Sequence, residues 1–174
     1  NQRMKERPIK ELTTALIKLG ARIDCPSGCP PLTISAQIPK GGEVEIKGNI
    51  SSQYLSAILM TSPFYKSDTQ ITVKEELYSK PYIKITLELI KKFGLQVQNH
   101  NYLKFSIPGN QKISPPNQFT VESDASNASY FGAYAALNPG HKITLNTISR
   151  SSIQGDIKFL EYLEKMGCQI KEEN

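Results

Sequence analysis

Small polar residues gather where expected strands give way to expected helices, and this pattern has the best potential for chemistry in the chain. The clearest case is the motif Gly48-Asn49-Ile50-Ser51-Ser52-Gln53. Gly48 permits a tight turn, after which two hydroxyls and an amide enter the first helical turn. Unpaired N–H groups and the positive end of the helix dipole favour an anion there. The motif therefore indicates phosphate binding, although a Ser that merely caps the helix would leave the same pattern.

Two cations precede prolines at other expected helix starts: Arg7 stands before Pro8, and Lys80 stands before Pro81. The helix dipole repels a cation at this end by roughly 0.3–1 kcal/mol unless an anion binds there. An Arg side chain can hold a carboxylate or phosphate through two parallel hydrogen bonds. The two placements predict a shared anionic ligand, with solvated surface positions as the alternative.

A hydroxyl and a phenol lie at the same helix start as Lys80, in Ser79 and Tyr82. The ring of Tyr82 could pack in the core or lie against a ligand, and the sequence leaves both open. The carboxylates of Glu122 and Asp124 flank Ser123 at an expected strand end. They could act as an acid–base pair or tie the backbone together through hydrogen bonds.

Metal chemistry is not expected, because the potential ligands are too scattered for a tetrahedral site. They are His100, His141, Cys25, Cys29 and Cys168. We therefore predict no metal, no cofactor, and reduced structural thiols of the kind found in the cytoplasm.

The helices that would carry the polar residues recur at a period of about 74 residues. Ile9 and Gly20 bound one amphipathic stretch, and Ile83 and Gly94 bound a second. A third copy ends at Gly167. A fixed period indicates one supersecondary unit that is used several times.

Hydrophobic periodicity predicts helices and strands in alternation. The expected helices are 9–19, 51–60, 82–93, 126–137 and 154–166. The expected strands are 21–25, 32–36, 43–47, 70–74, 95–98, 103–107, 119–122, 142–145 and 168–170. We expect an α+β fold in which helices cover sheets in each unit.

The composition is that of an ordinary globular protein, with 39% hydrophobic and 21% charged residues among 174. No apolar run approaches the roughly 20 residues of a membrane span. A net charge of +5 selects no partner by itself. The chain opens on polar residues without an initiator Met, and we interpret it as an internal segment of a longer protein.

Taken in order, these motifs resemble those of the 5-enolpyruvylshikimate-3-phosphate synthase family of the shikimate pathway. The matching segments are 4–9 (MKERPI), 48–55 (GNISSQYL), 79–83 (SKPYI), 122–126 (ESDAS) and 152–156 (SIQGD). The resemblance covers essentially the whole chain and implies two domains, each of three βαβαββ units. Residues 1–122 would be the C-terminal part of the domain that binds shikimate 3-phosphate, and 123–174 the first unit of the second domain. The repeats would then be incomplete at both ends.

The resemblance implies the transfer of the enolpyruvyl group of phosphoenolpyruvate to the 5-hydroxyl of shikimate 3-phosphate. It assigns phosphoenolpyruvate to Arg7, the shikimate phosphate to Ser51, Ser52 and Ser79, and the shikimate side to Tyr82. It alone places Gln53 between the two substrates. Ser123 stands where the family has Gly, which leaves the local hinge geometry open.

The family's catalytic base and its Gly-rich segment have no counterpart in these residues. We therefore expect no catalytic residue in the chain, and no activity from the chain alone. The expected protein is a cytoplasmic monomer that binds neither nucleic acid nor membrane.

Three alternatives remain from the sequence. One is the sister enzyme that acts on UDP-N-acetylglucosamine, which lacks the Ser-Ser-Gln pattern. The second is a non-catalytic RNA-binding repeat module, which would call for a basic stripe with stacking aromatics. The third is a segment that folds poorly alone, above all beyond Ser123.

Overall fold

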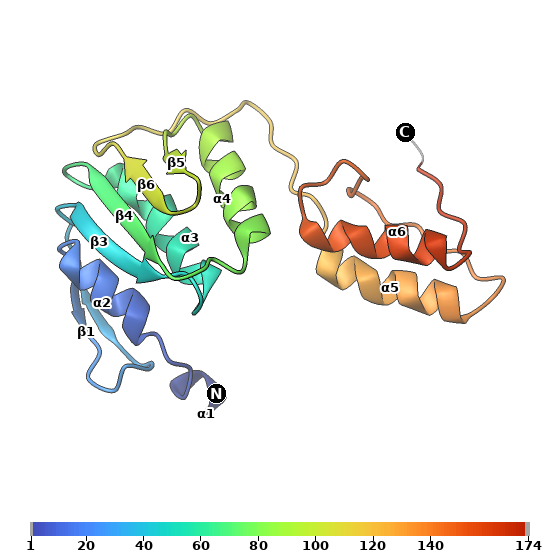
Figure 1. Cartoon of the computed structure of the whole chain (residues 1–174), viewed down its shortest axis with the longest axis horizontal. Coiled ribbons are helices and arrows are strands. Elements are labelled where there is room, and N and C mark those ends of the chain that lie inside the picture. The colour runs from blue at the N-terminus through green and yellow to red at the C-terminus, as the bar shows by residue number, and fades with distance from the viewer. Residues whose placement is uncertain (1, 173–174) are drawn as a thin grey trace. The chain divides into compact units, whose positions relative to one another are not determined.

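The computed structural model describes residues 2–172, and these form two compact units (Figure 1). The first is Asn1–Pro116 and the second is Asn117–Asn174. Each is described by itself below, as unit 1 and unit 2. The expected domain boundary between residues 122 and 123 stays a prediction.

Unit 1 is built around a four-stranded sheet in the order β3-β4-β6-β5. Its strands are β3 (Gly42–Lys47), β4 (Thr69–Lys74), β5 (Gln98–His100) and β6 (Lys104–Ile107). β3 and β4 pair in parallel, with Val44 opposite Ile71, whereas β4 and β5 each pair with β6 in antiparallel fashion. A parallel pair needs a crossover connection, and α3 (Ser52–Thr61) supplies it.

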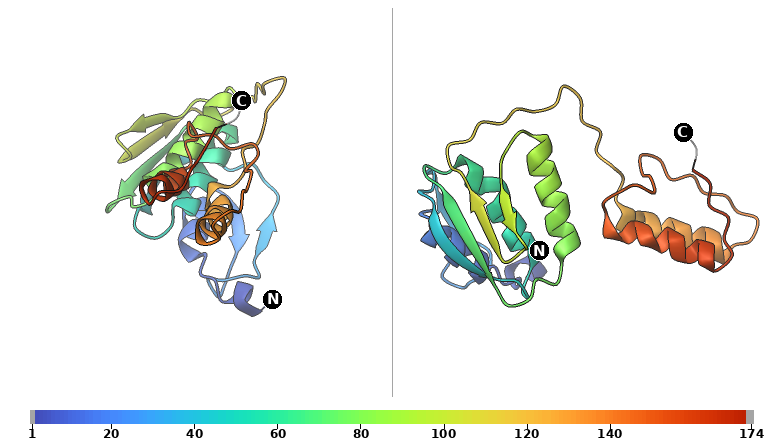
Figure 2. Two further views of the ribbon diagram at one scale, coloured as in Figure 1. Left: turned by 90° about the vertical axis from the view of Figure 1, so that its right-hand side faces the viewer. Right: turned by 45° about the horizontal axis from the view of Figure 1, so that its top comes forward.

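One face of this sheet is apolar, because side chains alternate in their burial along each strand. Val44 and Ile46 of β3 are buried, and so are Ile71 and Val73 of β4. The helices α3 and α4 (Lys80–Lys92) lie side by side and cover the apolar face (Figure 2). They contribute Leu55, Ile58, Leu59, Ile83 and Ile90 to the core.

The element order confirms the predicted α+β fold of repeated units. The run β3-α3-β4-α4-β5-β6 is one complete βαβαββ unit. Before it come α2 (Lys10–Lys18), β1 (Arg22–Asp24) and β2 (Thr33–Ser35), which have the order of the last three elements of such a unit. Gly20 closes α2 at φ +100°, a left-handed conformation that glycine adopts without steric cost.

Unit 2 contains two helices, α5 (Ala125–Leu137) and α6 (Lys158–Lys165), which pack against each other. A short 3-10 helix, Gly155–Ile157, leads into α6. In the described part of this unit the buried apolar side chains are Ala125, Ala128 and Leu163. Unit 2 therefore has a far smaller core than unit 1.

Several expected elements are absent or displaced. Residues 119–122, 142–145 and 168–170 form no strand, since no β-ladder forms among the described residues of unit 2 and a lone strand leaves its backbone groups unpaired. The strand expected at 95–98 begins only at Gln98, because Leu95 donates its N–H to Ile90 and completes the end of α4. The start of the helix expected at 154–166 is the 3-10 turn. A short helix that was not expected, α1 (Gln2–Lys5), opens the described residues.

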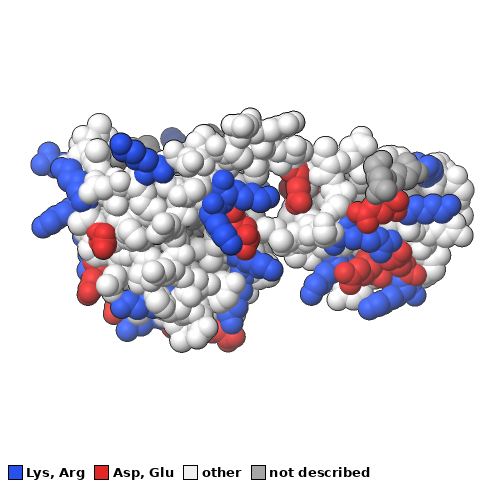
Figure 3. Space-filling view, turned by 90° about the horizontal axis from the view of Figure 1, so that it is seen from above, with Lys and Arg blue, Asp and Glu red and all other residues white. Residues whose placement is uncertain are grey.

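The surface shows mixed charge on the face drawn in Figure 3. Lys and Arg side chains stand there in separate groups, with acidic and uncharged residues between them. No helix among residues 2–172 is both long enough and apolar enough to cross a membrane.

Candidate functional site

The topology of unit 1 brings two helix starts to one edge of the sheet. β3 and β4 run parallel, α3 follows β3, and α4 follows β4. The carboxyl ends of both strands lie at the same edge, so the N-termini of α3 and α4 also lie there. Crevices beyond the carboxyl ends of parallel strands are the usual ligand sites of α/β units.

At the start of α3, the chain turns sharply because Gly48 packs against β4. A Cβ at Gly48 would lie 2.9 Å from Val73 Cγ1 and 3.0 Å from the carbonyl oxygen of Glu76. Ser51 then occupies the N-cap, where its Oγ accepts a hydrogen bond of 3.2 Å from the backbone N–H of Gln53. The cap interpretation therefore holds for Ser51. The hydroxyl proton of Ser51 stays available to donate to a ligand, because the capping bond uses only an oxygen lone pair.

At the start of α4, Ser79 takes the N-cap position without a capping hydrogen bond from its side chain. Pro81 lies in the first turn, as expected from its missing N–H. Tyr82 is 53% exposed, which excludes the interpretation as a core residue.

The two helix starts line one hollow of about 660 Å³. All of the predicted site residues except Arg7 contribute to it. The lining residues are Ile50, Ser51, Ser52, Gln53, Ser56, Met60, Ser79, Tyr82, Ile85 and Thr86. None of these side chains carries a charge. An anion held here would be bound by hydroxyls, an amide and the backbone N–H groups of two helix starts, with both helix dipoles favouring negative charge.

Sequence reasoning missed part of the lining of the hollow. Ser56 and Thr86 lie one helical turn beyond Ser52 and Tyr82, and their hydroxyl oxygens are 2.8 Å apart. The signal was available, because residues four apart in a helix share a face. Ile50, Met60 and Ile85 give the same hollow an apolar part.

Arg7 is exposed and does not line the hollow. The expectation that Pro8 lies in the first turn of a helix is wrong. Ile9 is the N-cap of α2, with a non-helical φ of −127° and ψ of 10°, because its N–H donates to the carbonyl of Gly28 at 2.8 Å. Arg7 and Lys80 are therefore not at equivalent positions, since Lys80 is the first residue of α4. The backbone beside Arg7 is nevertheless bonded to α3, because the Tyr54 phenol donates to the carbonyl of Pro8, the next residue in the chain.

The start of α5 in unit 2 is occupied by its own N-cap side chain. Asp124 caps α5 and accepts from the N–H groups of Ser126 at 2.8 Å and Asn127 at 3.4 Å. A carboxylate already neutralises this end of the dipole, so the expected likeness to the start of α3 does not extend to an open anion site.

Glu122 ties the backbone of unit 2 together, as one of the two interpretations predicted. It accepts from Ser152 Oγ at 2.7 Å and from Gln154 Nε2 at 3.0 Å. The same Gln154 amide also donates to the carbonyl of Ser123. Ser126 donates to the carboxylate of Asp156 at 2.6 Å. These motif residues hold one another within unit 2.

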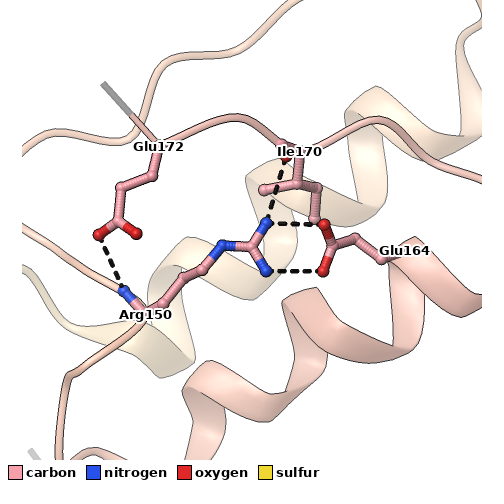
Figure 4. Close-up of polar contacts among 4 residues, drawn as sticks. All are labelled: Arg150, Glu164, Ile170 and Glu172. Atoms are coloured by element: carbon pink, nitrogen blue, oxygen red, sulfur yellow. Dashed lines mark hydrogen bonds and ion pairs between the residues drawn. The ribbon is translucent and has the colours of Figure 1, made fainter. Parts of the chain in front are cut away.

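A bidentate ion pair joins Arg150 to Glu164 of α6 in unit 2 (Figure 4). Arg150 donates to both carboxylate oxygens of Glu164, at 2.7 and 2.6 Å. It also donates to the carbonyl of Ile170 at 3.2 Å, which attaches the segment after α6. Within residues 2–172, no group of three or more His, Cys, Asp and Glu residues is arranged to hold a metal ion.

Comparison with known proteins shows the family to which the chain belongs. A family profile described as EPSP synthase (3-phosphoshikimate 1-carboxyvinyltransferase) matches residues 1–174. The chain belongs to the EPSP synthase family.

Two relatives show how much of an EPSP synthase is present. The 3-phosphoshikimate 1-carboxyvinyltransferase of Shewanella sp. (strain ANA-3) is 51% identical over 171 residues, which are 97% of this chain and 40% of the relative. That of Haemophilus influenzae (strain ATCC 51907) is 51% identical over 170 residues, again 97% of this chain and 39% of the relative. The chain thus spans about 40% of the length of the curated relatives that it matches.

A solved structure agrees with the fold. The EPSP synthase of Acinetobacter baumannii superposes with a TM-score of 0.67 at 26% sequence identity. The match covers 96% of this chain and 36% of the other.

Proposed function

We propose that this chain forms part of an enzyme that transfers the enolpyruvyl group of phosphoenolpyruvate to shikimate 3-phosphate. The observation that carries the proposal is the convergence of two helix starts and their hydroxyls on one hollow of unit 1. Relatives at 51% identity bear the name 3-phosphoshikimate 1-carboxyvinyltransferase, which supports the same reaction.

Within the hollow, Ser51, Ser52 and Ser79 bind the phosphate of shikimate 3-phosphate, and Tyr82 lies along its ring. Hydroxyl donors to a charged group each contribute about 1.5–3 kcal/mol. Gln53 lies on the same helix turn and reaches both substrates. Arg7 binds phosphoenolpyruvate, as a guanidinium suits its carboxylate or phosphate.

The reaction requires the 5-hydroxyl to lose its proton as its oxygen bonds to the central carbon of phosphoenolpyruvate, while the methylene carbon takes a proton and the carbon–carbon double bond becomes single. The resulting tetrahedral intermediate loses inorganic phosphate and one proton, which restores the double bond. The described residues bind and orient the two substrates for these steps. The groups that move the protons lie outside the chain, and we predict that the 174 residues alone have no activity.

A titration of the 174-residue chain with shikimate 3-phosphate tests the hollow directly. We expect saturable binding, measured by calorimetry, that is abolished by Ser51→Ala with Ser52→Ala. Ser35→Ala, on the exposed strand β2, is the matched control and should bind as the original chain does. The assignment of the phosphate to Ser51 and Ser52 would be wrong if the double variant still bound shikimate 3-phosphate. It would also be wrong if Ser35→Ala lost as much affinity as the double variant.

The sister reaction on UDP-N-acetylglucosamine is the main alternative. Titration of the same chain with that nucleotide sugar separates the two, because only the assigned substrate should protect the start of α3 from hydrogen exchange. Binding to RNA is disfavoured by the dispersed basic side chains on the face of Figure 3. An oligonucleotide titration at two salt concentrations tests it, since binding to phosphates weakens steeply with salt. A monomeric state and a cytoplasmic location remain predictions.

A further inference from the structure

One side chain joins the segments to which the two substrates are assigned. Tyr54 lies in the first turn of α3, directly after Gln53, and its phenol donates to the carbonyl oxygen of Pro8. Pro8 directly follows Arg7. The contact spans 46 positions of the chain and is therefore tertiary, not a product of local helix geometry.

The backbone of Arg7 is held only weakly by its own described hydrogen bond. α1, which precedes it, contributes no buried residue. The N–H of Arg7 reaches the carbonyl of Met4 only at 3.4 Å, at the long limit of a hydrogen bond. Pro8 has no N–H, so its carbonyl is the only backbone group that it can use as an anchor. Ile9 is held on the other side, by the carbonyl of Gly28 at 2.8 Å.

We propose that Tyr54 is a positioning residue that holds Arg7 at a fixed distance from the first turn of α3. This rests on the proposed function, because it takes Arg7 as a ligand of phosphoenolpyruvate and that turn as a ligand of shikimate 3-phosphate. Without the phenol bond, the backbone at Pro8 loses this link to α3, and the guanidinium of Arg7 samples more positions. The two substrates must lie within bonding distance, and misplacement of one binding group weakens that substrate selectively.

The test uses a protein of the relatives' full length that carries these 174 residues, with Tyr54→Phe as the variant. This substitution keeps the ring and removes only the hydroxyl. We expect KM for phosphoenolpyruvate to rise by roughly 2- to 10-fold, the loss of one ordinary hydrogen bond, with KM for shikimate 3-phosphate unchanged. A merely structural role would lower Tm and move neither KM, or both equally.

A double-mutant cycle with Arg7→Ala shows whether Tyr54 acts through Arg7. If it does, Tyr54→Phe has no further effect on KM for phosphoenolpyruvate once Arg7 is gone. Tyr65→Phe is the matched control: it removes a buried phenol that bonds to Thr61 and does not line the hollow, and it should leave the ratio of the two KM values unchanged.

The outcomes separate this inference from the function on which it rests. If the unaltered protein lacks enolpyruvyl transfer, the proposed function fails. If it is active and Tyr54→Phe leaves KM for phosphoenolpyruvate within twofold, or if the cycle is additive, only the role of Tyr54 is overturned.

Discussion

The hydroxyl oxygens of Ser56 and Thr86 lie 2.8 Å apart and join α3 to α4 in the lining of the hollow. Thr86 also donates its hydroxyl proton to the carbonyl of Tyr82 at 3.0 Å. A Thr hydroxyl has only one proton, so Ser56 must be the donor of the bond between the two helices. The pair thus fixes the first turn of α4 against α3, and with it the spacing of the predicted phosphate ligands.

Removal of the Thr86 hydroxyl should therefore cost stability and substrate affinity together. We expect Thr86→Val to lower the free energy of unfolding by about 1–2 kcal/mol, because it leaves Ser56 without its acceptor in a partly buried place. Urea unfolding of the chain, followed by circular dichroism, measures this. Ser56→Ala should cost less, and the double variant should cost less than the sum of the two. Additive losses would mean that the hydroxyls do not interact.

Arg7 and the Ser51–Ser52 pair should affect different substrates in a protein of full length. Arg7→Ala should raise KM for phosphoenolpyruvate by roughly 10-fold or more, the loss of a charged hydrogen-bonding group, and spare shikimate 3-phosphate. Ser51→Ala with Ser52→Ala should do the reverse. Steady-state kinetics with each substrate varied in turn decides between them. If both changes shift both KM values equally, the assignment of roles is wrong.

Gly48 should tolerate no side chain. A Cβ there would lie 2.9 Å from the Val73 side chain and 3.0 Å from the backbone of Glu76. The backbone cannot move away as the end of a flexible side chain can. We expect Gly48→Ala to destabilise unit 1 by about 1–3 kcal/mol through overpacking and to weaken binding at the start of α3. Thermal unfolding and the shikimate 3-phosphate titration measure the two effects. The φ of Gly48 lies outside the left-handed region, so a loss of stability there reports packing rather than backbone strain. A Gly48→Ala variant that is as stable as the unaltered chain would contradict the packing argument.

The sequence predicts those parts of this fold that are determined by residues close together in the chain. The alternation of Val44 and Ile46 with charged residues predicts β3, and Gly20 and Gly94 mark helix ends, because each feature depends on neighbours in the chain. The pairing of Phe105 with Ile71 in the sheet is a long-range choice that periodicity does not encode. The strands expected in unit 2 failed for the same reason, since a strand forms only where another strand pairs with it.

The candidate site shows the same limit. Ser51 and Ser79 could be singled out because a helix start has a local chemical signature. That their helices begin at one edge follows from the parallel pairing of β3 and β4, which the sequence does not state. The displacement of Pro8 from α2 arises from a bond between Ile9 and Gly28, and no pattern near Ile9 reveals it.

Unit 2 should open before unit 1 in the 174-residue chain. Its helices bury Ala125, Ala128 and Leu163 among the described residues, while unit 1 has a core that extends over its sheet and helices. Local opening is easiest where few apolar contacts are lost. Hydrogen exchange followed by mass spectrometry should show rapid exchange in α5 and α6, and slow exchange in α3, α4 and β4. Equal protection of the two units would contradict this expectation.

The ion pair between Arg150 and Glu164 should make the stability of unit 2 depend on pH. Hydrogen bonds from Arg150, and then its charge, lower the pKa of the Glu164 carboxyl below its usual 4.5. A carboxyl whose pKa is lowered by folding stabilises the folded state fully above its unfolded pKa, and the contribution is lost as pH falls through the lowered folded value. The guanidinium stays protonated throughout, since its pKa is raised. The pH-dependent part of this pair therefore disappears on acidification below about pH 4.5 and is constant from there to neutral pH.

Glu164→Gln removes the charge and keeps the shape of the side chain, so it isolates this effect. At pH 7 the variant should show faster hydrogen exchange in α6 and after it, because the segment at Ile170 is held by the same Arg150 side chain. As pH falls toward 3, unaltered and variant chains should converge in protection once the intrinsic exchange rate is corrected for pH. Glu161→Gln, on the same helix, is the matched control and should show little change, since its carboxyl acts on Arg150 only through weak charge attraction. A difference between Glu164→Gln and the unaltered chain that stays constant from pH 7 to pH 3 would show that the ion pair does not stabilise unit 2.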